Sequence, residues 1–151
     1  MGKLTVSIIS SAKERERFIK YLLNDIKALE MMIEQDMIER DITRIGAEQE
    51  LCLVDATWRP APIIQKVLEA IDDEHFTTEL AKFNLEINLD PLEFKTNCLS
   101  LLHDQLSDSV QRAAQATERF DAKVVLAGIL PTIRSKNLVF EMMTPLQRYH
   151  A

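Results

Sequence analysis

The sequence from residue 46 reads Gly46-Ala47-Glu48-Gln49-Glu50-Leu51. Alternate residues of a β-strand point to the same face, so Glu48 and Glu50 project together, about 7 Å apart along the strand. Two carboxylates on one face repel each other unless water solvates them or a cation lies between them. Hard cations such as Mg²⁺ take oxygen ligands, often carboxylates together with substrate phosphates. The stretch therefore predicts either a solvated surface strand or one wall of a metal–nucleotide site.

A second acidic segment follows, and it reads Thr77-Thr78-Glu79-Leu80-Ala81-Lys82-Phe83-Asn84-Leu85-Glu86-Ile87-Asn88. Its second half alternates apolar and polar residues, which predicts a strand with one buried face and with Glu86 on the polar face. We expect Glu48, Glu50 and Glu86 to share one face of a sheet. Glu79 precedes Glu86 by an odd number of residues. It reaches the same face only if the chain breaks, turns or bulges near Ala81–Phe83.

The rest of the chain alternates between helical and extended patterns. Ser11 is expected to cap a helix over Ala12–Glu39, in which apolar residues recur every three or four positions. The other expected elements are a strand over 44–54, a short helix over 63–71, an interrupted strand over 76–89, a helix from Asn97 or Ser100 to Phe120, a strand over 123–127 and a last short element near 138–142. This order predicts an α+β fold, with a small, mostly antiparallel sheet and helices on one face. We expect the long helix to form residues 1–43 and the sheet-bearing domain to form residues 44–151.

Composition and charge exclude several classes of protein. The chain has 151 residues, of which 46% are hydrophobic, enough for one globular core. A net charge of −6 argues against nucleic acid as a partner. No apolar run reaches the roughly eighteen residues of a membrane span, so no membrane partner is expected. Cys52 and Cys98 lie far apart and are expected to be reduced thiols of a cytoplasmic protein.

Three motifs, in this order and spacing, resemble the carboxylate–amine ligases related to glutamate–cysteine ligase. They are Gly46–Leu51, the pair Glu79 and Glu86, and Leu126-Ala127-Gly128-Ile129-Leu130-Pro131. The resemblance covers about Ile45 to His150 and leaves out the long first helix. It implies the amino-terminal part of a glutamine synthetase-like catalytic fold. In that fold, the concave face of a curved, largely antiparallel sheet holds Mg²⁺ and ATP.

The resemblance also implies roles for single residues. Matched position by position, the implied metal ligands are Glu48, Glu50, Glu79 and Glu86, and the residues implied to lie near substrate are Arg148 and Tyr149. The implied reaction is attack of a glutamate-like carboxylate on the γ-phosphate of ATP. A cysteine-like amine then displaces phosphate from the acyl phosphate to form an amide. The glutamates would be ligands that help neutralise the polyphosphate, not general acids, and no catalytic residue is assigned.

Two features depart from the family pattern. Ile129-Leu130 stands where the family has Thr-His before the proline, so no substrate role is assigned to that pair. Family members run to several hundred residues, and we therefore expect these 151 residues to be an inactive part of a longer enzyme. The alternative is a non-catalytic α+β oligomerisation or regulatory module whose acidic strands are merely solvated. A guanidino-kinase-like phosphotransferase is a third interpretation.

The long first helix suggests self-association. At roughly 40 Å it can extend beyond a single core, although packing within its own domain is the other interpretation. An incomplete sheet also leaves an edge strand unpaired. We expect a symmetric homodimer whose helical contacts are Leu22, Ile26, Leu29 and Ile33. Any binding of Mg²⁺ or Mn²⁺ by the 151 residues alone is expected to be weak.

Overall fold

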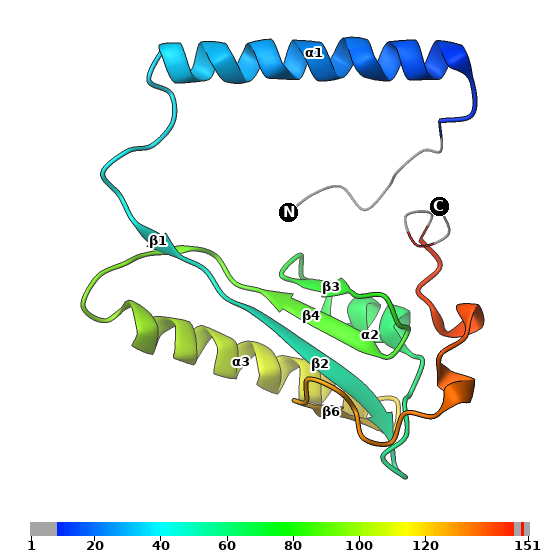
Figure 1. Cartoon of the computed structure of the whole chain (residues 1–151). Helices are drawn as coiled ribbons and strands as arrows, with labels where there is room; N and C mark the ends of the chain where they lie inside the picture. Colours follow the sequence, from blue (N-terminus) through cyan, green and yellow to red (C-terminus); the bar gives the residue numbers. More distant parts are fainter. Residues whose placement is uncertain (1–8, 147–148, 150–151) are drawn as a thin grey trace. The chain divides into compact units, whose positions relative to one another are not determined.

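The computed structural model describes residues 9–146 and Tyr149 (Figure 1). Its helices and strands are, in order, α1 (Ala12–Glu34), β1 (Arg44–Ile45), β2 (Glu48–Asp55), α2 (Ile64–Ile71), β3 (Phe76–Thr78), β4 (Asn84–Asn88), β5 (Leu92–Glu93), α3 (Cys98–Glu118) and β6 (Ala122–Val125). Two short 3₁₀ helices follow, η1 (Ser135–Asn137) and η2 (Phe140–Met142). The chain divides into two compact units, one formed by Thr43–Pro145 and one that contains α1.

An antiparallel sheet with the strand order β3-β4-β2-β6 forms the centre of the Thr43–Pro145 unit. β2 pairs with β4 from Glu48, opposite Asn88, to Cys52, opposite Asn84, and its second half pairs with β6. β1 and β5 form a separate two-stranded antiparallel ladder. The strand expected over residues 44–54 is therefore two strands, and the interruption falls at Gly46–Ala47, where a glycine weakens strand structure.

One face of the sheet is covered by α2 and α3. The buried cluster combines Leu51 and Leu53 of β2, Leu85 and Ile87 of β4, Ile64 and Val67 of α2, and Ala113 and Ala116 of α3. Successive strand residues point to opposite faces, so the even-numbered residues of β2 and β4 leave the sheet on its other side. The expected α+β fold, with a small antiparallel sheet and helices on one face, is confirmed.

Helix α1 begins where the sequence predicts. The Ser11 hydroxyl accepts a hydrogen bond from the Glu14 backbone N–H, and the Ser11 backbone N–H donates to the Glu14 carboxylate. This reciprocal capping box satisfies two of the unpaired donors at the start of the helix. Hydrogen bonds to the Glu14 carboxylate, from Ser10 first and then from Ser11, lower the pKa of Glu14 to about 2.

The helix ends at Glu34, earlier than the expected Glu39. Asp36 adopts the left-handed conformation, with φ of 55°. Its N–H donates to the Ile33 carbonyl, and the Met37 N–H donates to the Met32 carbonyl. These two bonds form a Schellman motif, which stops the helix although the apolar periodicity continues to Met37.

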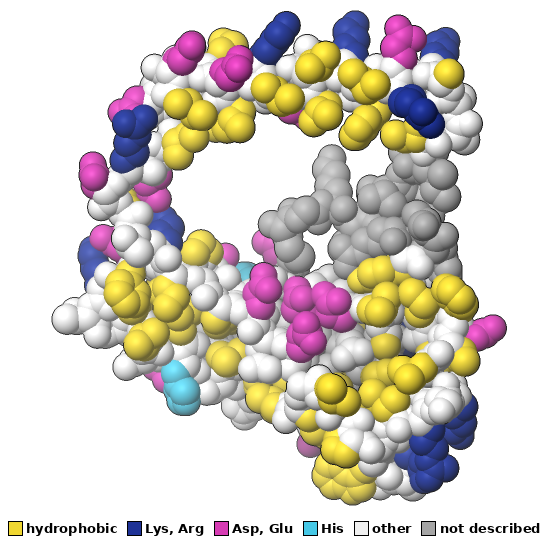
Figure 2. All heavy atoms as spheres, viewed as in Figure 1, with side chains coloured by type: hydrophobic (Ala, Val, Ile, Leu, Met, Phe, Trp, Pro, Cys, Tyr) yellow, Lys and Arg dark blue, Asp and Glu magenta, His cyan; other side chains and the backbone are white. Residues whose placement is uncertain are grey.

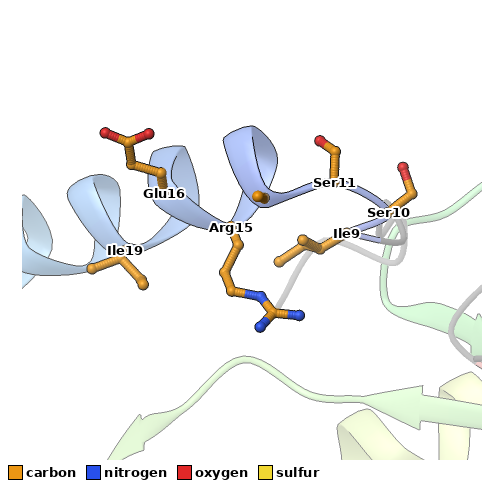
Figure 3. Close-up of a pocket in the computed structure, with 7 residues that line it drawn as sticks. Ile9, Ser10, Ser11, Arg15, Glu16 and Ile19 are labelled. Atoms are coloured by element: carbon orange, nitrogen blue, oxygen red, sulfur yellow. The ribbon is translucent and has the colours of Figure 1, made fainter.

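No residue of α1 is buried within the described part of the chain. Figure 2 shows hydrophobic side chains gathered along one side of this helix and charged side chains along the other. Large apolar side chains that are exposed on α1 include Phe18, Ile19, Leu22, Leu23, Ile26, Leu29 and Ile33. Close to the start of the helix, Ile19 extends from one side and Glu16 from the other (Figure 3).

The remaining elements follow the sequence closely until the last segment. α2, α3 and β6 lie within a few residues of their expected bounds, and Asn97 precedes the first residue of α3. The short strand or helix expected near residues 138–142 is the 3₁₀ helix η2, over Phe140–Met142. Cys52 and Cys98 are buried free thiols. None of the described helices combines the length and apolar character that crossing a membrane requires.

The turn after β2 carries Trp58 in the left-handed conformation, with φ of 62°. The Lys123 ammonium of β6 lies 4.9 Å from the centre of the indole ring, a cation–π contact. The Thr132 hydroxyl donates a hydrogen bond to the Trp58 carbonyl. The turn is therefore fixed to two segments that follow it far along the sequence.

Candidate acidic site

Glutamates of β2 and β4 meet on the sheet face that the helices leave uncovered. Glu50 lies directly opposite Glu86 in the antiparallel register, and Glu48 lies opposite Asn88. Directly opposite residues project from the same face, so Glu48, Glu50 and Glu86 share this face, as expected. Figure 2 shows a group of acidic side chains gathered in the middle of one side of the sheet unit.

Glu79 joins this group because the chain breaks after β3. β3 ends at Thr78, a bend and a turn occupy the next residues, and β4 begins at Asn84. The Glu79 carboxyl group hydrogen-bonds with Glu86, and this bond is the main reason why the pKa of Glu79 is raised. Partial burial and the charges of Glu86 and Glu50 raise the pKa further. The interruption expected near Ala81–Phe83 is present, and it brings the two glutamates together.

A distant segment holds the backbone at this break. The buried Thr144 hydroxyl donates to the Glu79 carbonyl at 2.7 Å, and the Thr144 N–H donates to the Leu80 carbonyl at 2.8 Å. The Lys82 N–H donates to the Met142 carbonyl at 2.8 Å. Sequence reasoning did not identify Thr144, since no local pattern links it to a strand end so far away in the sequence.

Asn88 orients one of the glutamates. Its side-chain amide donates to the Glu86 carboxylate at 2.6 Å. Asn88 lies two residues after Glu86 on β4, so both side chains are on one face of the strand. The strict alternation of residues 83–90 already placed Asn88 on the polar face, but it did not indicate that the two side chains bond to each other.

The same sheet face becomes apolar toward the end of β2. Cys52 and Val54 are buried there against Leu130. Burial, followed by the charge of Glu50, raises the pKa of the Cys52 thiol. A raised pKa keeps the sulfur protonated at neutral pH, which makes Cys52 a poor nucleophile. The acidic group is therefore bounded by a packed apolar end, and Leu130 of the Ile129-Leu130 pair contributes to that packing.

The acidic face supplies the right donor atoms for Mg²⁺ but not a finished coordination shell. Among the described residues, no three acidic, histidine or cysteine side chains are grouped closely enough to hold a metal ion. The close contact is the Glu79–Glu86 pair, and the interaction with Glu86 raises the pKa of the Glu79 carboxyl group. Two carboxylates held this close repel each other when both are ionised, and a divalent cation with oxygen ligands would relieve that repulsion. Glu48 and Glu50 would have to turn toward this pair to complete a site.

The two residues expected near substrate cannot be placed against the acidic face. Arg148 lies outside the described residues. Tyr149 is half-buried, and its N–H donates to the Leu146 carbonyl at 3.0 Å. Tyr149 belongs to the unit that contains α1, whereas the four glutamates belong to the other unit. The substrate-binding roles of Arg148 and Tyr149 stay predictions.

Comparison with known proteins agrees with the resemblance read from the sequence. A family model described as glutamate-cysteine ligase family 2 (GCS2) matches residues 44–151. A protein of Frankia casuarinae named "Putative glutamate--cysteine ligase 2-2" is 30% identical over 102 residues, which is 64% of this chain. The match spans 11% of that protein's length. No solved structure is significantly similar to the chain.

Proposed function

The chain belongs to glutamate–cysteine ligase family 2, and from this membership we propose that it forms part of the catalytic domain of an ATP- and Mg²⁺-dependent carboxylate–amine ligase. The proposed substrates are a glutamate-like carboxylate and a cysteine-like amine, joined through an acyl phosphate. The observation that carries the proposal is the convergence of glutamates from three separate segments, β2, β4 and the turn after β3, on one sheet face. A face that was merely solvated would have no reason to bring Glu79 against Glu86.

In this proposal the glutamates provide oxygen ligands for Mg²⁺. The sheet register fixes the backbones of Glu50 and Glu86 opposite each other, so that both carboxylates can reach one cation. Asn88 limits the rotation of the Glu86 carboxylate, and Thr144 holds the carbonyl group of Glu79. Rigid support of this kind is what a precise ligand arrangement requires. Bound Mg²⁺ would neutralise the charge of the ATP phosphates.

Metal binding to the chain tests the proposal. Mn²⁺ titration followed by electron paramagnetic resonance should show weak binding, with a dissociation constant of about 1 mM, because four carboxylates without ordered phosphate ligands compete poorly with water. Glu86→Gln should weaken that binding several-fold, since it removes a charge from the centre of the group. Glu118→Gln is the matched control, because Glu118 is an exposed glutamate of α3, away from the acidic face.

Equal Mn²⁺ affinities for the wild type, Glu86→Gln and Glu118→Gln would contradict the metal site and favour the non-catalytic module. The substrate pair needs a separate test on the protein that carries this sequence. Incubation with ATP, Mg²⁺, glutamate and cysteine should release phosphate and form the amide, as measured by mass spectrometry. Phosphate release that does not depend on the amine would argue against the ligase reaction.

A further inference from the structure

Both ring nitrogens of His75, the residue before β3, face carboxylates. Nδ1 lies 2.7 Å from an oxygen of Asp73, and Nε2 lies 3.2 Å from an oxygen of Asp90. An ionised carboxylate can only accept hydrogen bonds, and a neutral imidazole carries a single N–H. His75 can therefore bond to both aspartates at once only as the imidazolium cation.

The contact with Asp73 is the better supported of the two. The same Asp73 oxygen also accepts the His75 backbone N–H at 2.9 Å, and its other oxygen pairs with Arg112 of α3 at 2.8 Å. The Asp73 side chain is 21% exposed, whereas that of Asp90 is 79% exposed. A neutral ring would keep its proton on Nδ1, bonded to Asp73, and turn a bare Nε2 toward the Asp90 carboxylate. The contact with Asp90 is therefore the one that breaks when the proton is lost.

Two further charged residues line the polar pocket beside His75, and both belong to α3. They are Arg112 and Asp108. Arg112 is paired with Asp73, so its positive charge is largely compensated. Asp108 adds a third carboxylate to those of Asp73 and Asp90. The charges that surround the ring thus favour the imidazolium form.

Asp90 lies in a β-bulge between the two sheets. The Leu89 N–H donates to the Ala47 carbonyl at 2.9 Å, and pairing resumes where the last residue of β1 lies opposite the first residue of β5. Between these two points, Gly46 on one strand lies opposite Asp90 and Pro91 on the other, which is the arrangement of a bulge. The β1–β5 ladder beyond it has two residues in each strand, and a two-stranded ladder is marginally stable alone.

We propose that His75 is a pH-sensitive clamp on this bulge: its imidazolium holds the Asp90 carboxylate, and loss of the ring proton releases it. The protonated ring connects the start of β3 to the end of β4 and, through Asp73 and Arg112, to α3. Release removes one of the contacts that fix the bulge, so the β1–β5 ladder opens more often. Because β1 leads into β2, the clamp acts where the chain enters the four-stranded sheet. The proposal does not depend on the proposed ligase function.

Nitrogen NMR of the imidazole rings tests the chemistry of the clamp. At pH 5.5 both ring nitrogens of His75 should carry protons, and above the titration midpoint Nε2 should lose its proton while Nδ1 keeps it. Asp90→Asn should lower that midpoint, because a neutral amide replaces the carboxylate. The matched control is Asp104→Asn, which removes an exposed carboxylate beside His103 and should leave the His75 midpoint unchanged. A neutral ring protonated on Nε2, or an Asp90→Asn variant with the wild-type midpoint, would overturn the proposal.

Amide exchange tests whether the clamp holds the ladder. The Phe94 N–H donates to the Thr43 carbonyl at 2.8 Å, directly beyond the paired residues of β1 and β5. Its protection factor, which corrects for the intrinsic rise of exchange with pH, should fall about twofold from pH 5.5 to pH 8.5, the size expected for a partly exposed ion pair. The protection factor should stay nearly constant in Asp90→Asn and fall as in the wild type in Asp104→Asn. Constant protection in the wild type, or a full twofold fall in Asp90→Asn, would show that Asp90 and His75 do not control the ladder.

Discussion

A single buried hydroxyl contributes to the shape of the acidic face. Thr144 lies far from Glu79 in sequence, yet its hydroxyl donates to the Glu79 carbonyl at 2.7 Å and lies 2.8 Å from the hydroxyl of Thr78. The carbonyl groups at a strand end need donors once the ladder stops. The Thr144 hydroxyl supplies one donor to the Glu79 carbonyl and the Thr78 hydroxyl supplies a second at 3.0 Å, so this carbonyl is hydrogen-bonded where the backbone leaves the sheet.

Thr144→Val should lower the free energy of unfolding of the sheet unit by about 1 kcal/mol, because it replaces the hydroxyl by a methyl group of similar size and removes one of the two hydroxyl donors to the Glu79 carbonyl. It should also weaken Mn²⁺ binding, since Glu79 is no longer held. Urea unfolding and the Mn²⁺ titration measure the two effects. Thr144→Ser keeps the hydroxyl and should behave more like the wild type; equal losses for both variants would show that packing, not the hydrogen bond, matters here.

Charged residues around His75 form a second polar group, at the start of β3, whereas the chain break lies at its end. His75 bonds to Asp73 at 2.7 Å and to Asp90 at 3.2 Å, and Arg112 of α3 pairs with Asp73 at 2.8 Å. The bonds to Asp73 and then Asp90 raise the pKa of His75 above its ordinary value of 6.5. The backbone and side-chain bonds from His75, helped by Arg112, lower the pKa of Asp73 to about 2.

These shifts predict a pH dependence of stability. Protonated His75 stabilises the fold fully below pH 6.5, and this contribution is lost as the pH rises through the raised pKa. Ionised Asp73 stabilises the fold above its ordinary pKa of 3.8, and this contribution is lost as the pH falls through about 2. The midpoint of urea unfolding should therefore be higher at about pH 5.5 than at about pH 8.5. The corresponding difference in the free energy of unfolding should be only about 0.5 kcal/mol, because His75 is partly exposed and water screens its charge. His75→Gln should remove most of this difference; an unchanged difference in that variant would assign it to other groups.

At the scale of elements, the end of α1 depends on an aspartate in an unfavourable conformation. Asp36 occupies the position after the helix cap, where glycine is the usual residue because it has no Cβ to clash at positive φ. Asp36 also forms an exposed ion pair with Arg40 at 2.9 Å. Exposed pairs contribute little, so the backbone strain should dominate the effect of a substitution.

Asp36→Gly should stabilise α1 by about 0.5–1 kcal/mol, and Asp36→Ala should destabilise it by a similar amount. Far-UV circular dichroism during thermal unfolding measures both. The matched control is Asp25→Gly, which places the same glycine in the helix interior and should reduce helicity. Stabilisation by Asp36→Ala would contradict the Schellman end described above.

Sequence alone predicted the elements wherever periodicity or capping is local. The alternation at Phe83–Leu89 gave β4, and Ser11 with Glu14 gave the start of α1. The end of α1 was placed too late, because a left-handed aspartate interrupts a periodicity that runs on past it. The odd spacing of Glu79 and Glu86 correctly required a break. The Thr144 contact was not predictable, since it depends on tertiary packing across most of the domain.

At the scale of the whole molecule, the division into two units can be tested by removing α1 from the chain. The Thr43–Pro145 unit contains the whole four-stranded sheet and the helices that cover it, so its stability should not depend on α1. A chain shortened to residues 43–145 should keep slow hydrogen exchange at the amides of β2 and β4. Loss of that protection would show that residues outside this range complete the core.

Trp58 has a consequence for how the molecule can be observed. It is the only tryptophan in the chain, and it lies at the turn after β2, 53% exposed and under the Lys123 ammonium. Its fluorescence therefore reports on the sheet unit and not on α1, whereas far-UV ellipticity records the helices of both units. Emission and ellipticity followed on one unlabelled sample can thus separate the melting of α1 from that of the sheet. Because the cation lies over the indole ring, the emission should also respond to Lys123→Met, which makes the turn itself a local optical probe.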